Sequence, residues 1–123
     1  MPSLVVLMIE AEQPEGLSSR KLVVETAKHN VLSAYSKEDG LELLRRFPSV
    51  DAIFVHGALV ENSPEILNSL KERAPDVPLV LAAPFGNLSS PLANFVVDSH
   101  HPQELLRLLT QEIKPRQAAV SGR

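Results

Sequence analysis

The chain has 123 residues, of which 44% are hydrophobic, and its formal net charge is −3. This length suits one domain, and no apolar run is long enough to span a membrane as a helix. The protein has no cysteine, which excludes disulfides and thiolate metal sites and fits a reducing cytoplasm. Its 12 basic residues are scattered among 15 acidic ones, so no basic patch indicates nucleic-acid binding. The composition predicts a cytoplasmic domain without a membrane or nucleic-acid partner.

Apolar, β-branched runs alternate with helical patterns along the chain. A continuous run such as Ser3 to Ile9 is typical of a strand that is buried on both faces, as in a parallel sheet. The other predicted strands cover 30–35, 51–56, 78–83 and 94–97. Apolar residues spaced three and four apart predict helices over 17–29, 36–47, 63–74 and 102–113. Ser36 is the expected N-cap of the second helix, and Ser63 with Pro64 the expected start of the third.

The connection from Pro84 to Ala93 differs from the other crossovers. It contains two prolines, a glycine and two serines and has no helical period, so it is predicted to be a loop. The alternation of strands and helices predicts right-handed crossovers and a parallel sheet that is covered on both faces. No glycine-rich phosphate-binding motif is present. Residues 1–114 are expected to form the domain, and residues 115–123 a disordered tail.

Four local patterns, in this order and spacing, resemble the receiver domain of two-component response regulators. SVDAIFVH resembles the third strand of that family, SKEDGLELLRRFP its second helix, VPLVLAA its fourth strand and HPQELLRLL its closing helix. The resemblance covers roughly Ser3 to Ile113. It implies an α/β, flavodoxin-like three-layer sandwich with a five-stranded parallel sheet in the order 2-1-3-4-5. The family's fourth helix is expected to be short or missing, because the connection before the fifth strand is several residues short.

In the receiver family, phosphoryl transfer uses side chains at the carboxyl ends of the strands. An aspartate is the nucleophile, two acids hold Mg²⁺, and a hydroxyl group and a lysine contact the phosphoryl oxygens. The resemblance places the following residues at these positions: His56 for the nucleophile, Glu10 and Glu12 for the acids, Ala83 for the hydroxyl and Asp98 for the lysine. It therefore implies a pseudo-receiver that has lost aspartyl phosphorylation and its Mg²⁺ site, with no other cofactor.

Three interpretations of His56 remain open. The simplest is a pocket histidine that is hydrogen-bonded to its neighbours. The second is an internal lock, in which the carboxylates of Glu10 and Asp98 converge on His56 and favour the imidazolium form. The third is phosphorylation or metal binding at His56 itself. The first of these is favoured, and the second is motivated by the paired change of aspartate to histidine and lysine to aspartate.

An enzymatic role is disfavoured by the same residues. A small flavodoxin-like enzyme would need a phosphate-cradling loop or a nucleophile and base pair, and the sequence contains neither. Glu10 and Glu12 could form a carboxylate pair for acid and base catalysis, but a solvated loop after a strand is the simpler interpretation. His100 and His101 are likewise interpreted as a solvated loop at a helix start rather than as zinc ligands.

The leading prediction is a non-enzymatic signalling module that acts by protein–protein interaction in two-component or phosphorelay signalling. Its partner would be a histidine kinase or another regulator, and a homodimer is also left open. Phe85, Leu88 and Leu92, in the loop after the fourth strand, are the predicted partner contacts. The alternative is a receiver-like switch controlled by a small ligand or a proton in the vestigial pocket.

Overall fold

A parallel sheet between two layers of helices forms the centre of the fold in the computed structural model, which describes residues 4–10, 24, 27, 29–83, 91–98 and 101–113. The strand order is β2-β1-β3-β4-β5, as expected. The strands are β1 (Val5–Ile9), β2 (Asn30–Ala34), β3 (Ala52–His56), β4 (Leu79–Ala83) and β5 (Phe95–Asp98). The helices are α2 (Lys37–Arg46), α3 (Gly57–Asn62), α4 (Ile66–Arg73) and α5 (Pro102–Gln111).

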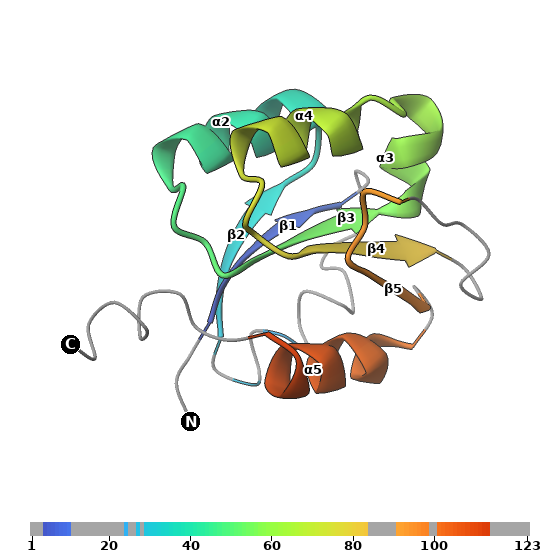
Figure 1. The fold of residues 1–123 in the computed structure, drawn as a ribbon. Coiled ribbons are helices and arrows are strands. Elements are labelled where there is room, and N and C mark those ends of the chain that lie inside the picture. The colour runs from blue at the N-terminus through green and yellow to red at the C-terminus, as the bar shows by residue number, and fades with distance from the viewer. Residues whose placement is uncertain are drawn as a thin grey trace.

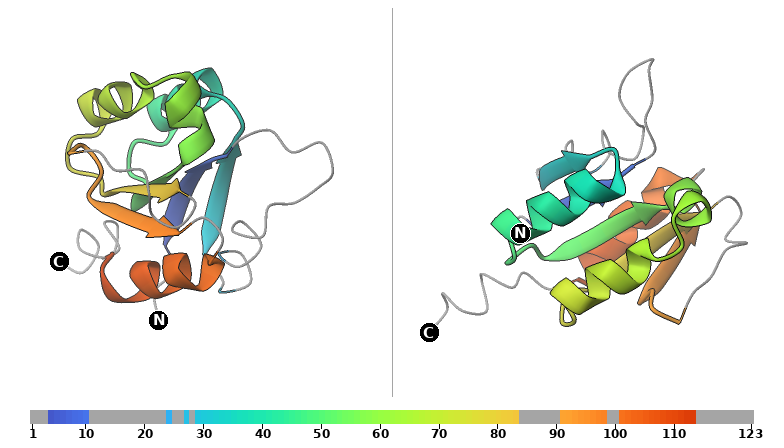
Figure 2. Two further views of the ribbon diagram at one scale, coloured as in Figure 1. Left: turned by 90° about the vertical axis from the view of Figure 1, so that its right-hand side faces the viewer. Right: turned by 90° about the horizontal axis from the view of Figure 1, so that it is seen from above.

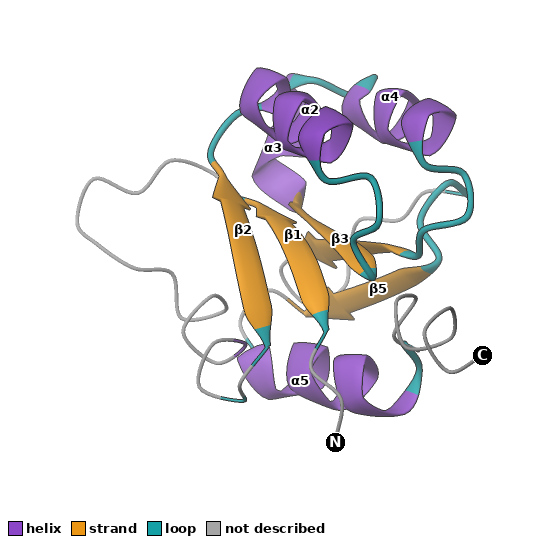
Figure 3. Ribbon diagram, turned by 90° about the vertical axis from the view of Figure 1, so that its left-hand side faces the viewer, coloured by secondary structure: helices purple, strands orange, loops and turns teal. Residues whose placement is uncertain are grey.

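The sheet is apolar on both faces, as its continuous hydrophobic strands predict. Helices α2, α3 and α4 cover one face, and α5 covers the other (Figures 1 and 3). Seen from above, α2 and α4 lie side by side over the sheet (Figure 2). Alternate residues of β1 divide between the two sides: Leu7 and Ile9 pack with α2 and α4, whereas Val6 and Met8 pack with α5. Each central strand therefore contributes to two separate apolar cores.

Two of the predicted helix starts, at Ser36 and at Pro102, are confirmed. Ser36 Oγ accepts a hydrogen bond from the Asp39 N–H at 3.1 Å and begins α2, and Pro102 lies in the first turn of α5. The helix predicted over 17–29 falls largely outside the described residues, although Val24 is fully buried in the core on the α5 side. The tail predicted over 115–123 also lies outside them. No helix in the described part of the chain is long and apolar enough to cross a membrane.

The prediction that a helix begins at Ser63 is wrong. The structure has two helices in this region: α3 follows β3 directly and ends at Asn62, with Ser63 as its C-cap, and α4 begins after Glu65. The Ser63 carbonyl accepts the Ile66 N–H at 3.0 Å across the turn between them. The Ser63–Pro64 pair therefore marks a turn between two short helices rather than the start of one helix.

The connection between β4 and β5 is described only in its second half. Residues 91–94 form a turn instead of a helix, which agrees with the predicted shortening of the fourth receiver helix. Leu92 is partly buried and packs against the core that β1 shares with α2 and α4. Leu92 is thus less exposed than expected, but its role as a partner contact stays a prediction, and Phe85 and Leu88 lie outside the described residues.

Candidate functional site

The carboxyl ends of the strands bring four of the predicted site residues to one edge of the sheet. Glu10 follows β1, and His56, Ala83 and Asp98 end β3, β4 and β5. The registers place these positions level across neighbouring strands, with Ile9 opposite Val55, His56 opposite Ala82, and Ala83 opposite Asp98. Glu12 lies outside the described residues. The edge predicted to hold the vestigial pocket is therefore formed by the fold.

The side chain of His56 caps a helix at this edge. It is both the last residue of β3 and the N-cap of α3, and its Nδ1 accepts the Ala58 N–H at 3.1 Å. A ring nitrogen that accepts a hydrogen bond carries no proton, so this contact requires a neutral imidazole with its proton on Nε2. The contact agrees with the simplest interpretation of His56, a histidine hydrogen-bonded to its neighbours. Protonation of Nδ1 would remove the cap from α3.

Asp98 is directed toward the start of α5. Its Oδ2 lies 2.8 Å from Nδ1 of His101, and its backbone N–H donates to Glu104 Oε1 at 3.1 Å. The strand β4 separates β3 from β5, so the backbones of His56 and Asp98 are on the order of 9.5 Å apart. An internal lock in which Glu10 and Asp98 converge on His56 therefore stays a prediction. Glu104 was not predicted to lie at this edge, although the sequence places it in the first turn of the last helix.

The remaining positions of the pocket offer little for binding a phosphoryl group or its metal. Glu10 is only 3% exposed, and its N–H donates to the Ala34 carbonyl at 2.9 Å. Ala83 is fully buried and presents a methyl group where receivers have a hydroxyl. Among the described residues, no three His, Asp or Glu side chains form a group that could hold a metal ion. Mg²⁺ prefers oxygen ligands, and His56 stands where receivers have a carboxylate. Because Glu12 lies outside the described residues, the loss of the family's Mg²⁺ site stays a prediction.

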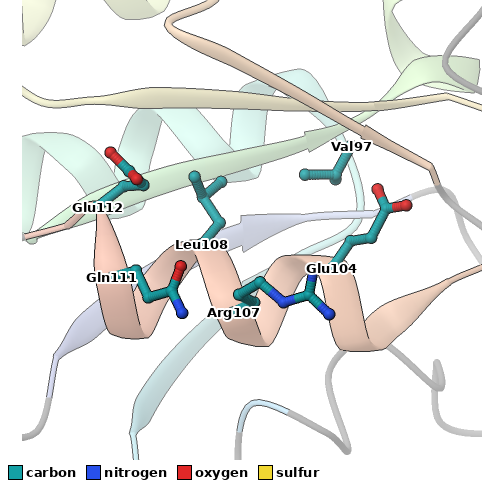
Figure 4. Close-up of a pocket in the computed structure, with 6 residues that line it drawn as sticks. All are labelled: Val97, Glu104, Arg107, Leu108, Gln111 and Glu112. Carbon is teal, nitrogen blue, oxygen red and sulfur yellow. The ribbon is translucent and has the colours of Figure 1, made fainter.

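A shallow pocket of about 290 Å³ lies between β5 and α5 (Figure 4). Val97 and Leu108 contribute its apolar surface, and its polar lining residues are Glu104, Arg107, Gln111 and Glu112. Glu104, Arg107, Leu108 and Gln111 come from α5, and Glu112 directly follows its last residue, so these five lie at spacings of three and four residues. That spacing indicates one common helix face, and it was the signal in the sequence that could have identified this surface.

Comparison with known proteins finds similarity in structure only. No protein-family model matches the sequence, and no curated protein is significantly similar to it. A putative response regulator from Chloroflexus aurantiacus superposes with a TM-score of 0.70 at 18% identity, covering 89% of this chain and 97% of that chain. A response regulator receiver domain protein from Clostridium thermocellum gives a TM-score of 0.65 at 18% identity, covering 86% and 98%.

A third match involves a complex of two signalling proteins. It is a chain in the structure of the phosphorylated P1 domain of CheA3 in complex with CheY6 from R. sphaeroides, with a TM-score of 0.61 at 20% identity. The alignment covers 87% of this chain and 93% of that chain. Together with the strand order β2-β1-β3-β4-β5, these matches show that the chain has the flavodoxin-like fold of response-regulator receiver domains.

Proposed function

We propose that this protein is a non-enzymatic, receiver-like signalling module that takes up no phosphoryl group and acts through contact with a partner protein. The observation that carries the proposal is the role of His56. At the position where receivers have the nucleophilic aspartate, this side chain uses Nδ1 to cap α3. A receiver nucleophile must instead present a free carboxylate oxygen to the incoming phosphorus.

The charges around His56 support the same conclusion. Phosphoryl transfer needs cations that neutralise the charge on the transferring group. At this edge Glu10 is a buried acid, and Asp98 provides a second acid where receivers have a lysine. Ala83 supplies no hydrogen-bond donor from its side chain. The edge would therefore repel a phosphoryl group rather than stabilise it.

Incubation with acetyl phosphate and Mg²⁺ should leave the native chain without a phosphoryl adduct in intact-mass spectra. Beryllofluoride should likewise cause no shifts in NMR spectra of the residues at the carboxyl edge. His56→Asn is the matched control, because asparagine can also cap a helix but cannot carry a phosphoryl group. An adduct on the native chain that disappears in His56→Asn would contradict the proposal. Beryllofluoride shifts centred on Glu10, His56 and Asp98 would instead favour a ligand-controlled switch.

The proposed partner is a protein such as a histidine kinase or another regulator. The match to a chain in the complex of CheA3 P1 with CheY6 supports a protein partner for a domain of this fold. The output surface would lie at β5 and α5. Val96 of β5 is 39% exposed, and it is the most exposed apolar side chain among the described residues of β5, so a partner can reach it.

Replacing Val96 with glutamate should reduce retention of the partner from extracts of the source cells by at least about tenfold, or about 1.4 kcal/mol. The reason is that a charged side chain would have to be desolvated in the contact. Quantitative mass spectrometry of proteins captured on the immobilised chain measures this loss. Phe47→Glu is the matched control. Phe47 is 46% exposed, but it follows α2, which packs on β1 and β2, whereas β5 lies at the other side of the sheet. Equal capture by Val96→Glu and the native chain would refute the proposed surface.

A further inference from the structure

Two side chains from outside the strand hold the amino end of β1. The Leu4 N–H donates to Nδ1 of His29 at 3.0 Å, and the Val5 N–H donates to Oδ2 of Asp51 at 2.7 Å. His29 directly precedes β2 and Asp51 directly precedes β3. Since β1 lies between these two strands, the two acceptors bind its backbone from both sides. Backbone hydrogen bonds join the chain segments at the same two points: the Asn30 N–H donates to the Leu4 carbonyl at 2.8 Å, and the Asp51 N–H donates to the Val5 carbonyl at 2.7 Å.

The hydrogen bond from Leu4 to His29 depends on pH. A neutral imidazole has one acceptor nitrogen, which it loses on protonation. Nδ1 of His29 must therefore be unprotonated to accept the Leu4 N–H. A proton on Nδ1 would place the Nδ1–H of His29 against the Leu4 N–H, and two donors cannot hydrogen-bond to each other. The backbone of Leu4, whose side chain is only 2% exposed, would then lose its partner at that point.

We propose that His29 is an acid-sensitive latch that holds the amino end of β1 while it is neutral and releases it when it is protonated. His29 lies at the edge of the sheet opposite His56, so the latch does not depend on the proposed signalling function. Release would be local, because β1 remains paired with β2 and β3 beyond this point. It would expose Leu4 and loosen the first residues of the strand whose other end leads to Glu10.

The surroundings of His29 place the transition in the acidic range. Partial burial lowers the pKa of His29 below its ordinary value of 6.5, and the Asp51 carboxylate acts against this in the smaller degree. Asp51 is the charged group that faces His29 among the described residues, and Leu4 and Val5 are apolar. Because the folded pKa is lower, the unfolded chain binds more protons, so this contribution to stability rises with pH. It is complete above the unfolded pKa of about 6.5 and is lost as the pH falls through the folded pKa.

NMR on the full chain tests the latch between about pH 8 and about pH 5. We expect ¹⁵N shifts to show His29 in the Nε2–H form with a midpoint below the ordinary value. Over the same range, Leu4 amide protection, corrected for intrinsic exchange, should fall at least about tenfold, while that of Val80 in the sheet centre stays constant. A midpoint at or above the ordinary value, an Nδ1–H form, or constant Leu4 protection would each overturn the proposal.

Two variants separate the latch from other effects of acid. His29→Asn places an amide oxygen where Nδ1 lies and does not titrate, so its Leu4 protection should not change with pH. His101→Asn removes an exposed histidine at the opposite edge and should retain the pH response of the native chain. A pH response that persists in His29→Asn would assign the effect to another group and overturn the proposal. Should His29→Asn fail to fold, the titration of the native protein decides alone.

Discussion

Replacing Asp51 with alanine should lower the free energy of unfolding by about 2–3 kcal/mol. The Asp51 side chain is buried, with 2% of the residue exposed, and it accepts the Val5 N–H at 2.7 Å. Alanine would leave this N–H without its acceptor at the start of β1, and an unsatisfied buried donor is the main source of the loss. Urea denaturation followed by circular dichroism measures the change, provided that the slope with urea stays the same.

Two further variants make this result specific to the hydrogen bond. Asp51→Asn keeps an oxygen at the same place, so it should lose distinctly less stability than Asp51→Ala. Glu72→Ala removes an exposed carboxylate from α4 and should change stability by no more than about 0.5 kcal/mol. If Asp51→Ala proves as mild as Glu72→Ala, the carboxylate does not hold the amino end of β1.

A Gly40→Ala substitution should destabilise the protein by about 1–3 kcal/mol, although alanine favours a helix over glycine by about 1 kcal/mol. Gly40 is a buried residue of α2 that lies directly against the end of β1. A Cβ atom at this position would lie 2.5 Å from Cδ1 of Ile9 and 3.0 Å from its Cγ1. Ile9 is itself fully buried, so its side chain has little room to move away.

The clash can be tested by removing the atom that causes it. Ile9→Val lacks Cδ1 and should by itself cost about 0.5–1.5 kcal/mol. In the double variant, the Cβ that Gly40→Ala introduces would fill the space that Cδ1 leaves. The two changes should therefore be less harmful together than the sum of the single losses, with a coupling of about 1 kcal/mol. Strict additivity of the unfolding free energies would show that Gly40 is needed for another reason.

Features encoded by neighbouring residues were predictable from the sequence. The continuous apolar strands indicated a sheet that is buried on both faces, and all five strands lie within about two residues of the predicted positions. Ser36 and Pro102 marked helix starts because capping depends on residues within one turn. The order of strands in the sheet came instead from the resemblance to receivers, since local patterns do not determine which strands become neighbours.

The errors arose where the outcome depends on distant contacts. Helix α3 has only six residues, too few to show a helical period, and its cap is a histidine, which is not among the usual capping residues. Leu92 lies in a segment rich in turn-forming residues, and only the path of the chain over the sheet shows that it packs on the core. The contacts of His29 and Asp51 with β1 join residues that are 25 and 46 positions apart. No local pattern indicates such pairs.

The central place of β1 also has a consequence for the order of events during synthesis. Its residues leave the ribosome before those of its two partners, β2 and β3, and β3 ends only at His56. The apolar segment VVLMI therefore stays unpaired until both neighbouring strands have been synthesised. Until then it can pair with other chains or be bound by a chaperone. A nascent chain that stalls before Ala52 should thus be recognised by chaperones that bind apolar segments, and one that extends past Ala83 should escape them.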